Sequence, residues 1–227
     1  MTTIASNLQA VRTAIDTAAI QSGRRFGEVK LLAVSKTFAA DKLREAYQAG
    51  QCCFAENYVQ EALGKMVTLR DLAIEWHFIG PIQGNKTRAI AENFTWVHSV
   101  DRLKIAERLS EQRPVNRPPL QICLQVNISN EASKGGVVVN EVKELAQAIA
   151  TLPNLKLRGL MAIPAPSEDV VIQRAGFAQL RQLYDQLNQQ GMQLDALSMG
   201  MSHDFAAAIA EGATMVRIGT AIFGSRT

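Results

Sequence analysis

The sequence has little that would indicate a secreted, membrane-spanning or disulfide-linked protein. It contains 3 cysteines, Cys52, Cys53 and Cys123, and this odd, sparse set is neither a disulfide framework nor a zinc-binding pattern. No apolar run approaches the length needed to cross a bilayer. The N-terminal segment also lacks the basic and apolar regions of a secretory signal. We therefore expect a cytoplasmic protein with small buried cysteines, no metal site and no membrane partner.

A strong charge of one sign is also missing. The formal net charge is +3, and charged residues of both signs, 20% of the total, are scattered along the chain. This weak, diffuse positive charge does not indicate nucleic-acid binding. Hydrophobic residues make up 47%, an ordinary value for a soluble globular protein. No glycine- or serine-rich linker divides the chain, so we expect one domain over residues 1–227.

The apolar residues follow alternating helix and strand patterns. Ile4, Leu8, Val11 and Ile15 recur at helical spacing and predict a first helix that ends near Gly23. The predicted strands are 29–36, 51–57, 75–80, 95–100, 120–128, 156–163, 195–201 and 214–224, the last with its turn. The predicted helices between them are 41–50, 58–69, 85–94, 101–112 with an Asp101 cap, 140–152, 168–190 and 204–212.

About eight strands that alternate with helices are typical of an α/β fold, the (β/α)8 TIM barrel. Several strands are apolar nearly throughout, as expected when both faces of a parallel sheet are buried. An open doubly wound sheet is the alternative, but no GxGxxG turn follows the first strand. We predict a barrel with an extra N-terminal helix.

Two neighbouring strand ends indicate an anion site. Ser202 lies just before a predicted helix, and Gly219 and Thr220 follow the last strand. Helix-start N–H groups attract anions, glycine lets a backbone approach closely, and the loops after strands seven and eight often bind phosphate in this fold. An ordinary cap at Ser202 and an ordinary turn at Gly219 are the alternative.

The first strand ends in a lysine that faces the same region. Alternation puts Leu32, Val34 and Lys36 on one face, and barrel closure would bring Lys36 beside Arg217 on the last strand. A partly desolvated lysine near another cation loses its proton more easily, and the neutral amine can form a Schiff base. A lysine with a phosphate site is the combination that holds pyridoxal phosphate. A solvated lysine, or one that contacts phosphate only as a charge, is the alternative.

Several blocks resemble a known family. LLAVSKT, FAENYVQE, EWHFIGPIQGNK, VHSVDR, RGLMAIP, LSMGMSHDF and MVRIGTAIFG are similar, in this order, to the pyridoxal phosphate homeostasis proteins, which are single-domain relatives of the fold-type III barrel of alanine racemase. The resemblance covers essentially the whole chain. It implies that Lys36 carries pyridoxal 5'-phosphate (PLP) as an internal aldimine, a Schiff base. The other implied cofactor-binding residues are Asn57, His77 and Met161 around the ring, Arg217 at the pyridine nitrogen, and Ser202, Gly219 and Thr220 at the phosphate, with Met201 adjacent.

The resemblance also implies weak catalysis. PLP is a strong electron sink when its ring nitrogen is protonated, and Arg217 has no acidic proton to share with it. Alanine racemase takes a second acid/base tyrosine from another domain, which we do not expect here. The tyrosines of this chain, Tyr47, Tyr58 and Tyr184, fall in predicted helices.

We therefore predict a PLP-binding protein of vitamin B6 and amino-acid balance that is not an efficient enzyme. We expect a monomer that passes PLP to apo-enzymes, with Lys134 in the loop after the fifth strand as a transient acceptor or as part of a solvated loop. A weak PLP-dependent amino-acid racemase is the first alternative. A Schiff-base aldolase, in which Lys36 attacks a carbonyl substrate, is the second.

Overall fold

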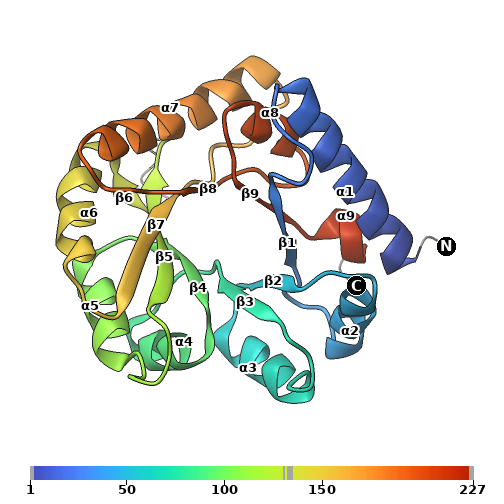
Figure 1. Cartoon of the computed structure of the whole chain (residues 1–227), viewed down its shortest axis with the longest axis horizontal. Helices are drawn as coiled ribbons and strands as arrows, with labels where there is room; N and C mark the ends of the chain where they lie inside the picture. Colours follow the sequence, from blue (N-terminus) through green and yellow to red (C-terminus); the bar gives the residue numbers. More distant parts are fainter. Residues whose placement is uncertain (1–2, 130, 132–134, 225–227) are drawn as a thin grey trace.

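Eight parallel strands close into a barrel within the part of the chain that the computed structural model describes, residues 3–129, 131 and 135–224 (Figure 1). The barrel strands are β1 (Lys30–Val34), β2 (Cys53–Glu56), β3 (Glu75–Phe78), β4 (Trp96–Val100), β5 (Leu120–Asn127), β7 (Leu155–Met161), β8 (Ala196–Ser198) and β9 (Met215–Ile218). Each strand pairs with the next, and β9 pairs with β1, which closes the ring. The predicted (β/α)8 barrel is confirmed.

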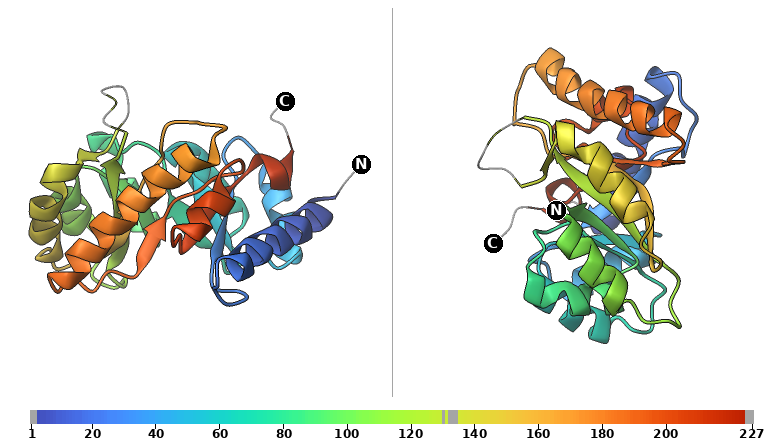
Figure 2. Two further views of the ribbon diagram at one scale, coloured as in Figure 1. Left: turned by 90° about the horizontal axis from the view of Figure 1, so that it is seen from above. Right: turned by 90° about the vertical axis from the view of Figure 1, so that its left-hand side faces the viewer.

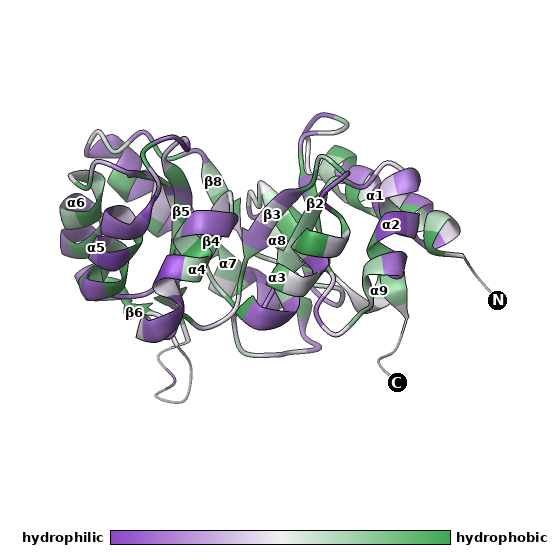
Figure 3. Cartoon of the chain, turned by 90° about the horizontal axis from the view of Figure 1, so that it is seen from below, coloured by the Kyte–Doolittle hydropathy of each residue, from purple (hydrophilic) through white to green (hydrophobic). Residues whose placement is uncertain are grey.

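Helices surround the strands on the outside (Figure 1). They are α1 (Ile4–Gln21), α2 (Ala40–Gln48), α3 (Val59–Thr68), α4 (Thr87–Asn93), α5 (Leu103–Gln112), α6 (Val142–Ala150), α7 (Val170–Gln189), α8 (Phe205–Ala210) and α9 (Thr220–Phe223), with short 3-10 turns η1 (Gly84–Lys86) and η2 (Val139–Glu141). Purple hydrophilic residues predominate on α2 and α5 in Figure 3. Among the described residues, no helix combines the length and apolar character that a membrane span requires.

Helix α1 is the predicted addition at the N-terminus of the barrel. Its apolar stripe, Ile4, Leu8, Val11 and Ile15, is buried, and the helix packs against α8 and α9 at one end of the molecule (Figure 2). The Thr3 hydroxyl accepts a hydrogen bond from the Ser6 N–H, which satisfies one donor of the first turn. The spacing of apolar residues therefore predicted this helix and its buried face correctly.

The strand side chains separate into two cores. Outward-facing residues such as Leu31 and Ala33 pack under the helices, whereas Leu32 belongs to a smaller cluster inside the barrel, against which Val34 packs. The other members of the inner cluster are Ala55, Trp96, Cys123, Met161, Ala196 and Met215. The predicted alternation along the first strand is confirmed, because a parallel strand buried on both faces sends successive side chains to opposite sides.

The structure differs from the sequence analysis at the start of α5 and after β5. Asp101 does not cap a helix: α5 begins at Leu103 behind Arg102, and the Asp101 carboxylate accepts from the Arg102 guanidinium instead. A short strand that we did not predict, β6 (Val137–Val138), pairs with the end of β5. Lys134 lies outside the described residues.

Candidate functional site

A cavity of about 240 Å³ opens at the carboxyl ends of the strands. It is lined by Val34, Lys36, Phe38, Asn57, Ile79, Ile163, Met201, Ser202, His203, Arg217, Gly219 and Thr220. Seven of the nine residues expected at the site, all except His77 and Met161, are in this set. Barrel closure brings them together, since Lys36 follows β1 and Arg217 lies on β9, its neighbour in the sheet.

Lys36 lies two residues beyond the end of β1 and is half-buried at the cavity. The next residue, Thr37, has a φ of 70°, a left-handed conformation that is unusual for a β-branched side chain. Such a backbone persists only where its surroundings hold it in place. The turn that carries Lys36 must therefore be held by neighbouring groups.

Those groups are three charged side chains, Glu56, Glu61 and Lys65, which we call the Lys65 clamp. Lys65 Nζ donates to the Ser35 carbonyl (2.7 Å), to Glu56 Oε1 (2.7 Å) and to Glu61 Oε1 (2.5 Å). Glu61 Oε1 also accepts from the Thr37 N–H (2.6 Å). The clamp thus holds the peptide groups on both sides of Lys36.

The Lys65 clamp is largely shielded from water. Lys65 is 6% exposed and Glu56 is 0% exposed. Burial raises the pKa of the Glu56 carboxyl above its ordinary value, and the Lys65 ammonium and the Ser35 hydroxyl oppose that rise. Our sequence analysis missed this cluster. The i,i+4 spacing of Glu61 and Lys65 was the available signal, but it is common on solvated helix faces.

The predicted anion site is built from two turns. Ser202 is not a helix cap, because α8 begins at Phe205 and Asp204 occupies the cap position, where its Oδ1 accepts from the Met201 N–H (2.5 Å). At the other turn, the Gly219 carbonyl accepts from the N–H groups of Ile222 and Phe223. No carbonyl of α9 is available to the N–H groups of Thr220 and Ala221, which begin that helix.

Gly219 allows this turn to approach β1 closely. A Cβ added at Gly219 would lie 2.9 Å from the Val34 carbonyl oxygen and 3.3 Å from Val34 Cβ. Real side chains do not tolerate that first distance without a backbone shift. The glycine therefore lets the start of α9 lie beside the strand that leads to Lys36.

Arg217 lies at the floor of the cavity and is 4% exposed. Its Nη1 donates to the Ser198 carbonyl (2.6 Å) and hydroxyl (2.8 Å), and its Nη2 donates to the Ala162 carbonyl (3.0 Å). Burial lowers the pKa of the guanidinium to about 10. The side chain is thus still a cation at neutral pH, held in a fixed orientation by neutral acceptors.

Asn57 contributes a polar atom without a partner. Its Oδ1 is buried and accepts no hydrogen bond from the described residues, although the side chain lines the cavity. A buried carbonyl oxygen without a donor costs free energy unless a ligand or water satisfies it. A ligand or a water molecule beside Asn57 could supply the missing donor.

His77 and Met161 lie in the barrel interior and do not line the cavity. Both are 0% exposed. His77 is hydrogen-bonded to His98 and Glu75, and Met161 packs in the inner apolar cluster. Alternation along β3 and β7 directs both side chains into the barrel. Both residues lie within their strands, whereas Lys36 lies beyond the end of β1. Their contact with a ring stays a prediction.

Comparisons with known proteins show what this chain is similar to. Residues 4–227 match the family model described as alanine racemase, N-terminal domain. A curated pyridoxal phosphate homeostasis protein of Pseudomonas aeruginosa is 60% identical over 226 residues, which are 100% of this chain and 97% of the relative. The structure of PipY of Synechococcus elongatus PCC7942 with PLP bound has a TM-score of 0.86 at 38% identity and covers 97% of this chain and 100% of PipY. Alanine racemase of Corynebacterium glutamicum, at 18% identity and a TM-score of 0.69, shares the fold over 98% of this chain and 61% of its own.

Proposed function

Because this chain belongs to the pyridoxal phosphate homeostasis proteins, within the family of the alanine racemase N-terminal domain, we propose that it binds PLP and acts in PLP homeostasis. The observation that carries the proposal is the meeting of three features in one cavity. These are the Lys36 amine, the buried cation Arg217 and the helix start at Gly219 and Thr220. PLP has three groups that match them: an aldehyde, a pyridine nitrogen and a phosphate.

The residues at the cavity fit this cofactor. The N–H groups of Thr220 and Ala221 and the Ser202 hydroxyl are suited to the phosphate, since donors at a helix start favour an anion. Arg217 can donate to the pyridine nitrogen and Asn57 is placed beside the ring. Lys36 is the amine that would attach the aldehyde covalently. PLP, when bound, supplies an aldehyde that bonds reversibly to amines and a conjugated ring that can take up electrons.

We propose that the protein is a carrier rather than an efficient enzyme. Arg217 can only donate hydrogen bonds, so at the ring nitrogen of PLP it would leave that nitrogen unprotonated and the electron sink weak. Tyr47, Tyr58 and Tyr184 do not line the cavity. Met201 and Ile163 at the cavity are 37% and 39% exposed, so we expect a bound cofactor to be open to exchange with the amines of PLP-accepting apo-enzymes.

One observation favours weak racemase activity as a second candidate. His203 lines the cavity together with Lys36, so two groups able to exchange protons are present. Hydrogen–deuterium exchange at the α-carbon of amino acids, measured for the native protein and for His203→Asn, separates the two candidates. Exchange at enzymatic rates that depends on His203 would contradict the carrier proposal and support a racemase.

Borohydride reduction followed by peptide mapping tests the cofactor assignment. The reduced adduct should map to the peptide that contains Lys36, and Lys36→Ala should lose that adduct and bind PLP more weakly. Lys42→Ala is the matched control, because Lys42 is exposed on α2 and does not line the cavity. An adduct of the native protein that maps to another lysine would contradict the assignment.

A further inference from the structure

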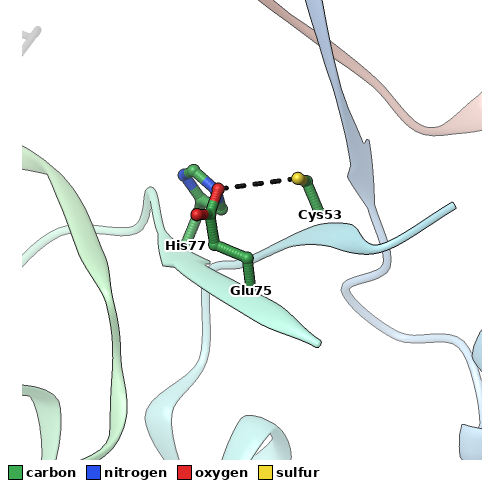
Figure 4. Close-up of side chains that lie close together, drawn as sticks. All are labelled: Cys53, Glu75 and His77. Atoms are coloured by element: carbon green, nitrogen blue, oxygen red, sulfur yellow. Dashed lines mark hydrogen bonds and ion pairs between the residues drawn. The ribbon is translucent and has the colours of Figure 1, made fainter. Parts of the chain in front are cut away.

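A row of polar side chains runs through the barrel interior from the cavity floor to the opposite end. Arg217 Nη1 lies 2.8 Å from Ser198 Oγ, which lies 2.8 Å from His98 Nδ1. His98 Nε2 lies 2.9 Å from His77 Nδ1, and His77 Nε2 lies 2.8 Å from Glu75 Oε1. Figure 4 shows the far end of this row, where His77 and Glu75 meet.

The row is buried except at its last member. Ser198, His98 and His77 are 0% exposed, and these residues come from three different strands, β8, β4 and β3. Glu75 is half-buried at the start of β3, where Lys30 also donates to its Oε1 (3.0 Å). Imidazoles and hydroxyls inside an apolar barrel are costly unless every polar atom is paired. Here each ring nitrogen has one partner.

When both rings are neutral, the carboxylate end allows only one direction for the hydrogen bonds. A guanidinium can only donate and an ionised carboxylate can only accept. Ser198 Oγ accepts from Arg217 and, because a neutral His98 that donates from Nε2 has an acceptor at Nδ1, the Ser198 hydroxyl donates to His98 Nδ1. His98 then donates from Nε2 to His77 Nδ1, and His77 donates from Nε2 to Glu75. In this direction both histidines are neutral and carry their proton on Nε2, whereas a charged His77 would instead have His98 carry its proton on Nδ1 and donate to Ser198.

The electrostatics of the row agree with this direction. The hydrogen bond from His77, with the nearby Lys30 ammonium, lowers the pKa of Glu75 to about 2, which keeps it an acceptor. Burial lowers the pKa of both histidines, most strongly that of His98, which keeps the rings neutral. The charged groups around the rings are Glu75, Lys30 and Arg217.

We propose that Ser198, His98 and His77 form a one-way hydrogen-bonded chain from Arg217 to Glu75 that fixes the orientation of the Arg217 guanidinium toward the cofactor. These four residues are positioning residues, since they act through Arg217. The effect on the cofactor rests on the proposed function; the chain itself does not. Ser198 accepts both hydrogen bonds from Nη1, and the Ala162 carbonyl accepts one from Nη2. The Nε hydrogen and the second Nη2 hydrogen of Arg217 are left for the cavity.

A cation site at the far end is a weaker interpretation of the same residues. Ligand atoms of Cys53, Glu75 and His77 lie within 4.8 Å of one another (Figure 4). The Lys30 ammonium already contacts the shared Glu75 oxygen, and burial raises the pKa of the Cys53 thiol to about 12. The thiol donates to Glu75 at 3.5 Å and adds one more donor to the acceptor end of the chain.

Histidine side-chain NMR tests the chain directly. The sequence has 3 histidines, so a long-range proton–nitrogen spectrum of the ¹⁵N-labelled, PLP-free protein is simple to assign with His203→Asn. We expect His77 and His98 both as neutral rings protonated on Nε2. Finding either ring protonated on Nδ1, or charged at neutral pH, would overturn the proposal.

The variant Glu75→Gln tests whether a change at one end of the chain alters the protonation of His98, which Glu75 does not touch. A glutamine amide can donate as well as accept, so it no longer dictates the direction of the chain. We expect a second population of His98 protonated on Nδ1, although Glu75 does not touch His98. Asp195→Asn is the matched control, because Asp195 pairs with Arg158 outside the chain and should leave His98 unchanged. An unchanged His98 in a folded Glu75→Gln protein refutes the coupling.

Two further measurements keep the proposal testable if that variant does not fold. Ser198→Ala should keep both Nε2 protons, which Glu75 still dictates, but should shift the His98 Nδ1 signal that has lost its donor; no shift counts against the chain. Adding PLP to the native protein should then move the same Nδ1 signal through Arg217. If PLP does not bind, the proposed function fails, but the protonation states of His77 and His98 still test the hydrogen-bonded chain. If PLP binds without moving the His98 Nδ1 signal, the link between the chain and the cofactor is wrong.

Discussion

Replacing Lys65 by methionine removes the central cation of the Lys65 clamp. In the native protein this ammonium lies 2.7 Å from Glu56 Oε1, and both side chains are almost fully buried. Methionine keeps much of the side-chain length but leaves the Glu56 carboxylate without its partner. Because a buried charge without a partner is far more costly than a paired one, we expect a large loss of stability.

The expected loss follows from the burial of the pair. Removing one partner of a buried ion pair costs about 3–5 kcal/mol in free energy of unfolding, which corresponds to roughly 6–20 °C in melting temperature for a chain of this size. Urea denaturation of the PLP-free protein measures it. The exposed pair Lys42–Glu45 supplies the control: Lys42→Met should change the free energy of unfolding by less than about 1 kcal/mol.

The stability lost in Lys65→Met should increase as the pH rises. Burial already raises the pKa of Glu56 in the folded state, so its ionised form lowers stability as pH rises through that pKa. Without Lys65 this pKa rises further. The difference between Lys65→Met and the native protein should therefore be larger at about pH 8 than at about pH 5.

A double variant separates charge from packing. Glu56→Gln added to Lys65→Met removes the stranded charge and should restore more than half of the lost stability. The reasoning fails if Lys65→Met costs less than about 1 kcal/mol, if its effect is the same at both pH values, or if the double variant is no more stable than the single one.

Three further predictions concern close packing and thiol reactivity. A Cβ at Gly159 would lie 1.7 Å from the Ala196 carbonyl oxygen, so Gly159→Ala should lower the free energy of unfolding by at least about 2 kcal/mol; a native-like melting temperature would contradict this. Gly219→Ala should weaken PLP binding about tenfold or more, because the start of α9 must move away from Val34; titration that gives native affinity would exclude the close approach. The expectation of buried cysteines is wrong for Cys52, which is exposed, whereas burial raises the pKa of the Cys53 and Cys123 thiols to about 12. An alkylating reagent at neutral pH should therefore label the folded protein at Cys52 first and reach the other two on unfolding. Equal labelling of all three in the folded state would refute it.

Local periodicity was enough to predict the architecture. The alternation of Leu31 to Val34 placed Leu32 and Val34 inside the barrel and aimed Lys36 at the same side, and the stripe from Ile4 to Ile15 predicted the added helix. Both patterns depend on the fixed geometry of a strand or a helix, which neighbouring residues in the chain set on their own. The order of strand ends then led to Arg217, Gly219 and Thr220, because closure places the last strand beside the first.

The partners of buried polar groups were not predictable in this way. Ser198 meets His98 across 100 positions and Lys65 meets the Ser35 carbonyl across 30, so these contacts depend on strand register and on where α3 packs. A serine before a helix and an aspartate at a helix start also looked like caps, yet the observed helix starts leave Ser202 and Asp101 outside those roles. The sequence by itself determined which face each residue occupies and which strand ends bear reactive groups. Only the tertiary structure decided how deep each side chain lies and which donor meets which acceptor, because those depend on register, tilt and closure, to which residues far apart in the chain all contribute.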